Sequence, residues 1–98
     1  MKVLRGIAGF EWDEYNRDKN FIKHRVTDTE SEEAFFDENK KTLKDILRSG
    51  KEKRYILIGQ TKKGRSLFVV FTIRKNKIRI ISARDLNKKE RYLYEEKT

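Results

Sequence analysis

The chain has 98 residues, of which 36% are apolar and 42% charged, and its 25 lysines and arginines against 16 acidic residues give a formal charge of +9. This length fits one domain. The absence of cysteine excludes disulfides and thiolate metal sites, and a single histidine argues against structural zinc. No apolar run approaches the ~20 residues of a membrane helix, and the N-terminus lacks a secretory signal, so we expect a cytoplasmic protein. The charge indicates a polyanion or an acidic protein as partner, with an inert basic surface as the alternative.

The first quarter of the chain predicts a short strand followed by a helix. We expect residues 1–9 to be a loosely ordered lead to a core over 10–94, in a single domain spanning 1–98. The stretch FEWD at 10–13 predicts a short strand that ends in a helix cap at Asp13. A helix over 14–24 follows, and its apolar stripe is Trp12, Tyr15, Ile22 and Val26, with Lys19 on the same side.

A second short helix is predicted to begin at a capping box. The Thr27 side chain accepts a backbone N–H bond, and the Glu30 side chain reaches back to the backbone N–H of Thr27. This helix is predicted to carry Ala34, Phe35 and Phe36 into the core. Residues 42–47 read either as an edge strand or as a helical turn, and residues 49–53 as a charged loop.

Three strands are predicted next, over 54–60, 66–74 and 77–84, with turns at 61–64 and 75–77. Asn87 and Glu90 form a further capping box that begins a final helix of about ten residues. The order β-α-α-β-β-β-α predicts an α+β domain whose antiparallel sheet is packed by two N-terminal helices and a C-terminal helix.

A four-residue turn that pairs Gln60 with Arg65 predicts which side chains share each face of the sheet. The face expected under the N-terminal helices carries Ile56, Ile58, Leu67, Val69, Phe71, Ile73, Ile78 and Ile80, with Arg54 at one end and Ser82 and Arg84 at the other. The opposite face carries Tyr55, Leu57, Gly59, Phe68, Val70, Thr72, Arg74, Arg79, Ile81 and Ala83.

Arg74 and Arg79 become close cross-strand neighbours if the turn near Asn76 has two residues. Like charges in such a pair cost up to ~1 kcal/mol, and a bound anion would turn this cost into a gain. The alternative is that both side chains extend into water at the tip of the hairpin.

A series of short motifs runs in order through residues 10–94. They are FEWD (10–13), Asn20-x-x-Lys23-His24-x-Val26, Glu33-Ala34 with Phe36-Asp37, Arg54 with Gly59, Gly64-Arg65 with Phe68–Thr72 and Arg74, RIISAR (79–84), and Glu90 with Tyr94. In this order and spacing, the set resembles the BrnT family of bacterial type II toxins, which belongs to the RelE-like ribonuclease superfamily.

The resemblance implies a RelE-like fold, an RNA-cleaving toxin and a BrnA-like antitoxin with a ribbon-helix-helix DNA-binding part, in a two-plus-two hetero-oligomer. It leaves open whether RNA is cut free or on the ribosome. The chain departs from the family at Arg25, where glycine is usual after the Lys-His pair, so we expect the helix end to be built differently. Asn16 replaces a lysine, which puts one phosphate contact in question, and residues 38–53 lack the usual proline.

RNA can be cleaved without a metal when its 2′-hydroxyl attacks the adjacent phosphate, with help from a base, an acid and positive charge. Arginine suits the charge role because its planar fork grips two phosphate oxygens. The expected catalytic side chains are His24, Arg54, Arg65, Arg79, Arg84 and Tyr94, with Lys23, Lys62, Lys63 and Arg74 as RNA-binding residues and no cofactor or metal.

Two of these residues have structural alternatives. His24 is the only side chain with an ordinary pKa near neutrality, yet it could instead cap the carbonyls at a helix end. Tyr94 could stack on a base or donate a proton, or it could anchor the last helix to the sheet. At the level of the whole protein, the alternatives are a non-catalytic RNA- or DNA-binding module and a surface that only receives an acidic antitoxin segment.

Overall fold

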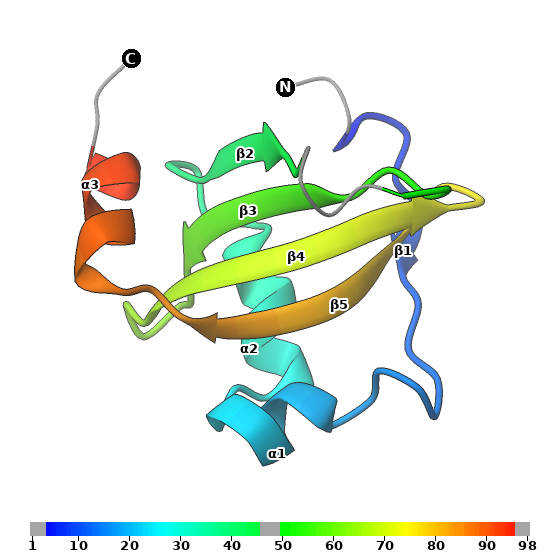
Figure 1. Cartoon of the computed structure of the whole chain (residues 1–98), viewed down its shortest axis with the longest axis horizontal. Coiled ribbons are helices and arrows are strands. Elements are labelled where there is room, and N and C mark those ends of the chain that lie inside the picture. The colour runs from blue at the N-terminus through cyan, green and yellow to red at the C-terminus, as the bar shows by residue number, and fades with distance from the viewer. Residues whose placement is uncertain (1–3, 46–49, 96–98) are drawn as a thin grey trace.

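A five-stranded sheet with helices on both faces organises the chain, and the computed structural model describes residues 4–45 and 50–95. The elements are β1 (Gly9–Phe10), α1 (Lys19–His24), α2 (Asp28–Ala34), β2 (Lys41–Lys44), β3 (Tyr55–Gln60), β4 (Ser66–Arg74), β5 (Lys77–Asp85) and α3 (Lys88–Glu95). The strand order is β1-β5-β4-β3-β2. Figure 1 shows α1 and α2 on one side of the sheet, with α3 and the β4–β5 turn at opposite ends. The predicted α+β class is confirmed.

The two outer strands differ from the predicted arrangement. β2 pairs antiparallel with β3, so the strand alternative for 42–47 holds for the part of that segment that the structure describes. β1 pairs in parallel with β5, which makes the sheet mixed instead of wholly antiparallel. The described part of the lead is attached, because Leu4 and Ile7 pack against the main core.

The helix predicted over 14–24 is wrong in its first half. Asp13 caps only a turn, in which its carboxylate accepts from the Tyr15 N–H at 2.9 Å and its carbonyl accepts from the Arg17 N–H at 2.8 Å. Asp18 then takes a left-handed conformation with φ 59°, and α1 begins after it. The expected apolar stripe is therefore broken, with Tyr15 74% and Ile22 76% exposed.

Two buried asparagines close the outer edge of β5 beyond the short β1. The Asn16 amide donates to the Ile80 carbonyl at 3.1 Å and to the Glu11 carbonyl at 3.0 Å. The Asn20 side chain accepts from the Ala83 N–H at 3.0 Å. Buried backbone polar groups need partners, and these side chains supply them where no further strand pairs.

The C-terminus of α1 keeps the geometry that usually calls for glycine. Arg25 adopts φ 57°, and its N–H donates to the Phe21 carbonyl while the Val26 N–H donates to the Asn20 carbonyl. The expectation that this end is built differently is wrong: a non-glycine residue takes the left-handed conformation, at a cost of about 1 kcal/mol.

The capping box of α2 is confirmed, with the Glu30 N–H donating to the Thr27 hydroxyl and the Thr27 N–H donating to the Glu30 carboxylate. Ala34 and Phe35 are buried as predicted. Phe36 is not, since 75% of it is exposed beyond the end of the helix.

The predicted faces are wrong for β3, because the loop after it has five residues and pairs Gln60 with Ser66. This shift by one position turns every β3 side chain to the other side of the sheet. Leu57 now packs in the main core under α2, and Gly59 lies so close to α2 that a Cβ would meet the Ala34 carbonyl. Ile56 and Ile58 lie on the opposite, open face.

A bulge at Ile81 turns the side chains of the second half of β5 to the other face of the sheet, since Val70 pairs with Ser82 but Phe71 pairs with Ile80. Ala83 therefore joins the main core, and Arg84 lies across from Phe68 on the open face. The predicted face is wrong for Ala83, Ser82 and Arg84 and right for the residues before the bulge.

The main core lies between the sheet and α1 and α2, and a smaller cluster lies under α3 on the open face. This smaller cluster consists of Ile58, Phe68, Val70 and Leu86, with Ile56, Ile81 and Tyr94 packed against it. None of the helices in the described part of the chain lies over the rest of the open face, toward the two-residue turn at Lys75 and Asn76 (Figure 1).

The left-handed Arg25 generates a stability prediction. Arg25→Gly should raise the free energy of unfolding by about 0.5–1 kcal/mol, because glycine reaches this conformation without a Cβ clash. Lys23→Gly, two residues earlier and inside α1, is the matched control and should lower it by about 1 kcal/mol. Urea unfolding of the three proteins measures both effects, and equal losses in the two variants would contradict the cap geometry.

Candidate nucleic-acid interface

Three arginines from three neighbouring strands meet on the uncovered part of the open face. Arg54 directly precedes β3, Arg74 ends β4, and Arg79 lies near the start of β5. They line a groove of about 180 Å³ whose walls are Tyr15, Asn16, Lys19, Glu52, Arg54, Thr72, Arg74, Arg79, Ile80 and Ile81. We call it the arginine groove. The shifted register of β3 brings Arg54 here, because its neighbour Tyr55 points into the main core.

Arg79 is nearly buried and is oriented by two carboxylates. Its guanidinium donates to Asp13 at 2.8 and 3.0 Å and to Glu11 at 3.1 Å. The hydrogen bond from Arg79 lowers the pKa of Asp13 below its ordinary value. These contacts use the guanidinium edge that faces the 11–13 segment and hold its position in the groove.

Arg74 is oriented from the loop before β3. Its Nε and Nη2 donate to the two carboxylate oxygens of Glu52 at 2.6 and 3.1 Å, which lowers the pKa of Glu52. The pair is partly exposed, so its net contribution to stability is small. Arg74 and Arg79 lie on the same face, as predicted. The alternative that both side chains extend into water is wrong, because each is paired with acidic side chains.

The arginine groove carries more positive than negative charge. Its walls hold four cations, Lys19, Arg54, Arg74 and Arg79, and one carboxylate, Glu52. Glu11 and Asp13 lie behind Arg79 and reduce this excess. A groove with this balance attracts phosphate more strongly than a neutral one.

His24 and Arg65 lie at the other end of β5. The Arg65 guanidinium donates to Asp85 at 2.6 and 3.1 Å, to Glu30 at 3.2 Å, and to the carbonyls of Arg25 and His24 at 2.8 and 3.3 Å. These contacts match the five N–H donors that an arginine possesses. Arg65 therefore has no donor left for a phosphate in this arrangement.

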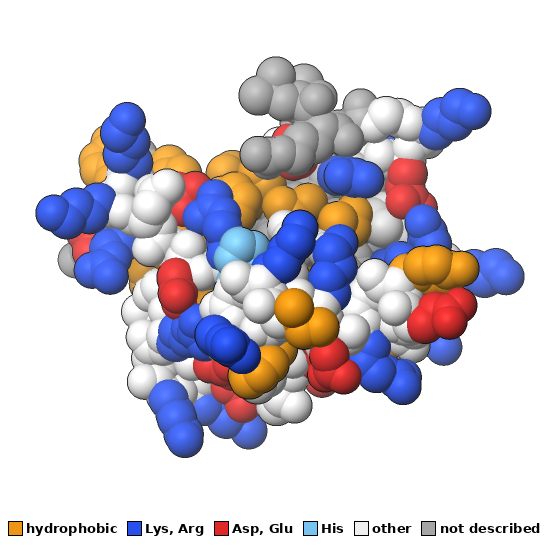
Figure 2. All heavy atoms as spheres, turned by 60° about the horizontal axis from the view of Figure 1, so that its bottom comes forward, with side chains coloured by type: hydrophobic (Ala, Val, Ile, Leu, Met, Phe, Trp, Pro, Cys, Tyr) orange, Lys and Arg blue, Asp and Glu red, His pale blue; other side chains and the backbone are white. Residues whose placement is uncertain are grey.

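The His24 side chain is exposed at the end of α1. Figure 2 shows the histidine at the surface with basic side chains beside it. Its positive form lowers the pKa of Asp85, after the larger effect of the hydrogen bond from Arg65. His24 is thus part of the group around Arg65.

Arg84 and Tyr94 hold α3 against the sheet. The Arg84 guanidinium donates to both carboxylate oxygens of Glu90 at 2.7 Å and lies 4.2 Å from the centre of the Phe68 ring. The Tyr94 hydroxyl donates to Asp37 at 2.7 Å. Burial and this hydrogen bond raise the pKa of Tyr94 to about 12, which makes it a poor proton donor at neutral pH. The anchoring alternative describes the Tyr94 contacts.

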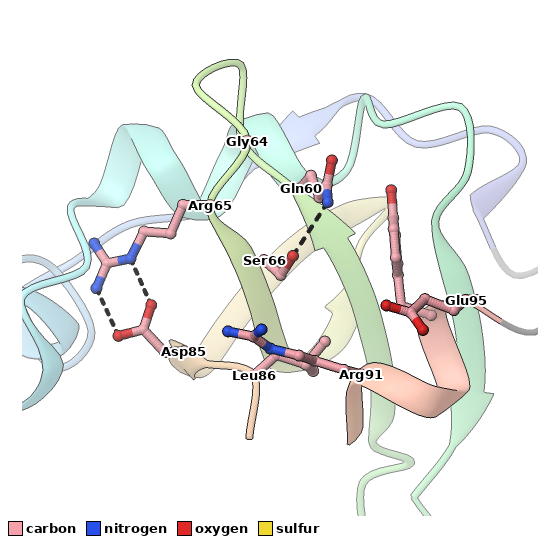
Figure 3. A pocket seen from close by; sticks show the side chains of 9 residues that line it. Gln60, Gly64, Arg65, Ser66, Asp85, Leu86, Arg91 and Glu95 are labelled. Carbon is pink, nitrogen blue, oxygen red and sulfur yellow. Dashed lines mark hydrogen bonds and ion pairs between the residues drawn. The ribbon is translucent and has the colours of Figure 1, made fainter. Parts of the chain in front are cut away.

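A larger pocket of about 660 Å³ lies between the 61–65 loop and α3, lined by Gln60, Gly64, Arg65, Ser66, Asp85, Leu86, Arg91, Tyr94 and Glu95. Figure 3 shows the Arg65–Asp85 pair at one side of it, with Arg91 and Glu95 toward the other. Its two arginines face two carboxylates, so it lacks the positive excess of the arginine groove. Lys62 and Lys63 are exposed on the adjoining loop, and Lys23 on α1.

The residues predicted for one site fall into two groups at opposite ends of β5. Arg79 and Asp85 are separated by about 20 Å along the strand, at ~3.3 Å per residue. Arg54, Arg74 and Arg79 lie at one end, whereas His24 and Arg65 lie at the other. The two groups cannot act on the same phosphate.

Sequence reasoning missed three residues of the arginine groove: Tyr15, Lys19 and Glu52. Tyr15 and Lys19 were assigned to a helical stripe that Asp18 interrupts, and the sequence carries no evident signal for that interruption. Glu52 lies in a loop that periodicity does not describe.

No helix among the described residues is long and apolar enough to cross a bilayer. No three His, Cys, Asp or Glu side chains within residues 4–45 and 50–95 gather as ligands for a metal ion.

A small α+β domain that presents clustered arginines on an open sheet face has the features of a protein that binds RNA or another polyanion. Residues 12–90 match a family described as the ribonuclease toxin, BrnT, of type II toxin–antitoxin systems. The match covers most of the chain, which therefore belongs to the BrnT family. Membership makes it a ribonuclease toxin, with RNA as substrate and an antitoxin as partner. A comparison with curated proteins gives no significant match.

The arginine–carboxylate pairs predict acid sensitivity. Hydrogen bonds from Arg79, Arg74, Arg65 and Arg84 lower the folded-state pKa of Asp13, Glu52, Asp85 and Glu90 respectively. A lowered folded pKa stabilises the protein above the ordinary values of 3.8 for Asp and 4.5 for Glu, and the gain is lost as pH falls. The free energy of unfolding should therefore decline below about pH 4.5.

The double variant Asp85→Asn/Glu90→Gln should be less stable than the native chain at neutral pH and should lose less stability on acidification. Urea unfolding at a series of pH values measures both slopes. Parallel curves for the native chain and the variant would contradict the assignment of acid sensitivity to these pairs.

Proposed function

We propose that this toxin cleaves RNA in the arginine groove, without a metal, by attack of a 2′-hydroxyl on the adjacent phosphate. The observation that carries the proposal is the convergence of Arg54, just before β3, with Arg74 of β4 and Arg79 of β5 in one groove. Guanidinium groups fixed in advance stabilise the charge that develops on a phosphorane without reorganising during the reaction.

The reaction forms a bond between the 2′-oxygen and phosphorus and breaks the bond to the 5′-oxygen of the next nucleotide. The 2′-hydroxyl loses a proton and the leaving oxygen gains one. The products are a 2′,3′-cyclic phosphate, or its opened form, and a 5′-hydroxyl end.

Proton transfer is the weaker part of this site. Glu52 is the one carboxylate among the described walls of the groove. The hydrogen bond from Arg74 lowers the pKa of Glu52, which makes it a weak base. Water serves as the acid. Most of the rate enhancement then comes from positioning and charge, which predicts slow cleavage of free RNA and a gain from a ribosome that holds the message in place.

The second group of basic residues receives other roles in this proposal. Lys23, Lys62 and Lys63 are exposed and contact the RNA backbone beyond the cleavage point. Arg65 supports the end of α1, while Arg84 and Tyr94 secure α3. His24 takes no part in proton transfer at the groove.

The proposed partner is a BrnA-like antitoxin with a ribbon-helix-helix DNA-binding part, and the proposed fold relationship is to RelE-like toxins. An acidic antitoxin segment that covers the arginine groove would compete with RNA for the same guanidinium groups. A two-plus-two assembly with the antitoxin, in the cytoplasm, completes this proposal.

Arg54→Ala and Arg74→Ala should each lower cleavage about a hundredfold or more, as loss of one charge-stabilising donor does elsewhere. Growth arrest on induced expression, with mapping of new RNA 5′-hydroxyl ends, measures the effect. Arg91→Ala, which removes an exposed arginine from the other pocket, is the matched control and should keep activity.

His24→Ala decides between the two ends of β5. Retained cleavage supports the arginine groove, whereas loss of cleavage by a folded His24→Ala protein would locate the chemistry beside Arg65. If the native protein binds RNA but produces no new 5′ ends, it is a non-catalytic binding module. If toxicity survives both Arg54→Ala and Arg74→Ala, the groove is a surface that only receives the antitoxin.

A further inference from the structure

Tyr15 forms part of the wall of the arginine groove, and 74% of it is exposed. It lies in the turn between β1 and α1, one residue before the buried Asn16. The other groove walls are mostly charged or polar, so Tyr15 supplies an aromatic surface in the same groove as three arginines and a lysine.

The backbone of Tyr15 is joined to the guanidinium of Arg79 through one carboxylate. Asp13 Oδ1 accepts both the Tyr15 N–H at 2.9 Å and Arg79 Nη2 at 3.0 Å. The next residue, Asn16, is tied to the Ile80 carbonyl of β5 at 3.1 Å. The backbone that carries the ring is therefore held in a constant position relative to the arginines.

The exposed ring of Tyr15 has no evident role in packing. Tyr55 stacks on Phe71 in the main core, and the hydroxyl of Tyr94, on α3, donates a hydrogen bond to Asp37. Tyr92 resembles Tyr15 in being 68% exposed, but it lies on α3 and lines neither the groove nor the larger pocket. The two exposed tyrosines thus differ in whether they line the arginine groove.

Exposed aromatic rings beside a positive groove are how proteins hold single-stranded nucleic acid, because each base can stack on a ring while its phosphate meets a cation. We propose that Tyr15 is a base-stacking residue that holds the nucleobase next to the phosphate in the arginine groove. The substrate class is single-stranded RNA, since a base inside a duplex is stacked on its neighbours and has no free face. This inference rests on the proposed function and adds to it a contact that sets the position of the bases.

The test uses a short single-stranded RNA with 2′-O-methyl groups, which lacks the nucleophile and so measures binding alone. Tyr15→Ala should weaken its binding about tenfold to a hundredfold, the range of one base–aromatic stack. Tyr15→Phe should keep native affinity because the ring remains. Tyr92→Ala, the matched exposed tyrosine, should also bind like the native chain.

A second arm identifies the contact. The probes of a series each lack the base at one position. The probe that lacks the stacked base should bind the native protein more weakly than the intact probe does, whereas Tyr15→Ala should bind these two probes equally. Equal affinity of Tyr15→Ala and the native chain, equal losses in Tyr15→Ala and Tyr92→Ala, or absence of binding to the probe would each overturn the inference.

The outcomes separate this inference from the proposed cleavage site. If Arg74→Ala abolishes cleavage while Tyr15→Ala changes neither affinity nor the abasic profile, the cleavage site stands and the stacking role fails. If the arginine variants cleave normally but Tyr15→Ala loses affinity at one position, the stacking role stands and the chemistry occurs elsewhere.

Discussion

The guanidinium of Arg65 is the contact on which the arrangement of the helices depends. It joins the carbonyls at the end of α1, the capping carboxylate of α2 and Asp85 at the end of β5. Because the left-handed Arg25 exposes carbonyls at this point, a donor with several N–H groups in a fixed plane is needed there. Lysine, with one flexible ammonium, could not replace it. Both helices are short, so their position on the sheet comes from such contacts more than from helix propensity.

The same chemistry recurs around the open face, where acidic side chains hold Arg74, Arg79 and Arg84. Such pairs lower the mobility of the guanidinium groups and reduce the entropy lost when a phosphate binds. In the proposed cleavage site, an RNA phosphate would displace these carboxylates from the guanidinium groups. A small protein with a formal charge of +9 can support this exchange, because the long-range field favours the polyanion.

Local patterns of the sequence predicted β3, β4 and β5 and the class of fold, since these depend on neighbouring residues. They also predicted both capping boxes, including the one in which Asn87 and Glu90 each accept the other's backbone N–H. They did not predict two local irregularities: the five-residue loop after Gln60 and the bulge at Ile81. Each moves side chains to the other face, because strand side chains alternate with a period of two. Arg54 therefore joins Arg74 and Arg79, while Arg84 leaves the face covered by α1 and α2 and lies on the face that carries α3. The distance between His24 and the groove depends on tertiary packing and had no signal in the sequence.

Asn16 and Asn20 show what a short β1 requires. A sheet edge with unpaired backbone groups is a template for strand addition and aggregation. By bonding Ile80 and Ala83, the two asparagine side chains occupy positions where another chain would pair. The opposite border of the sheet is β2, which has a lysine at each end. The sheet is thus protected at one border by amides and at the other by charge, and self-association by strand pairing is discouraged at both.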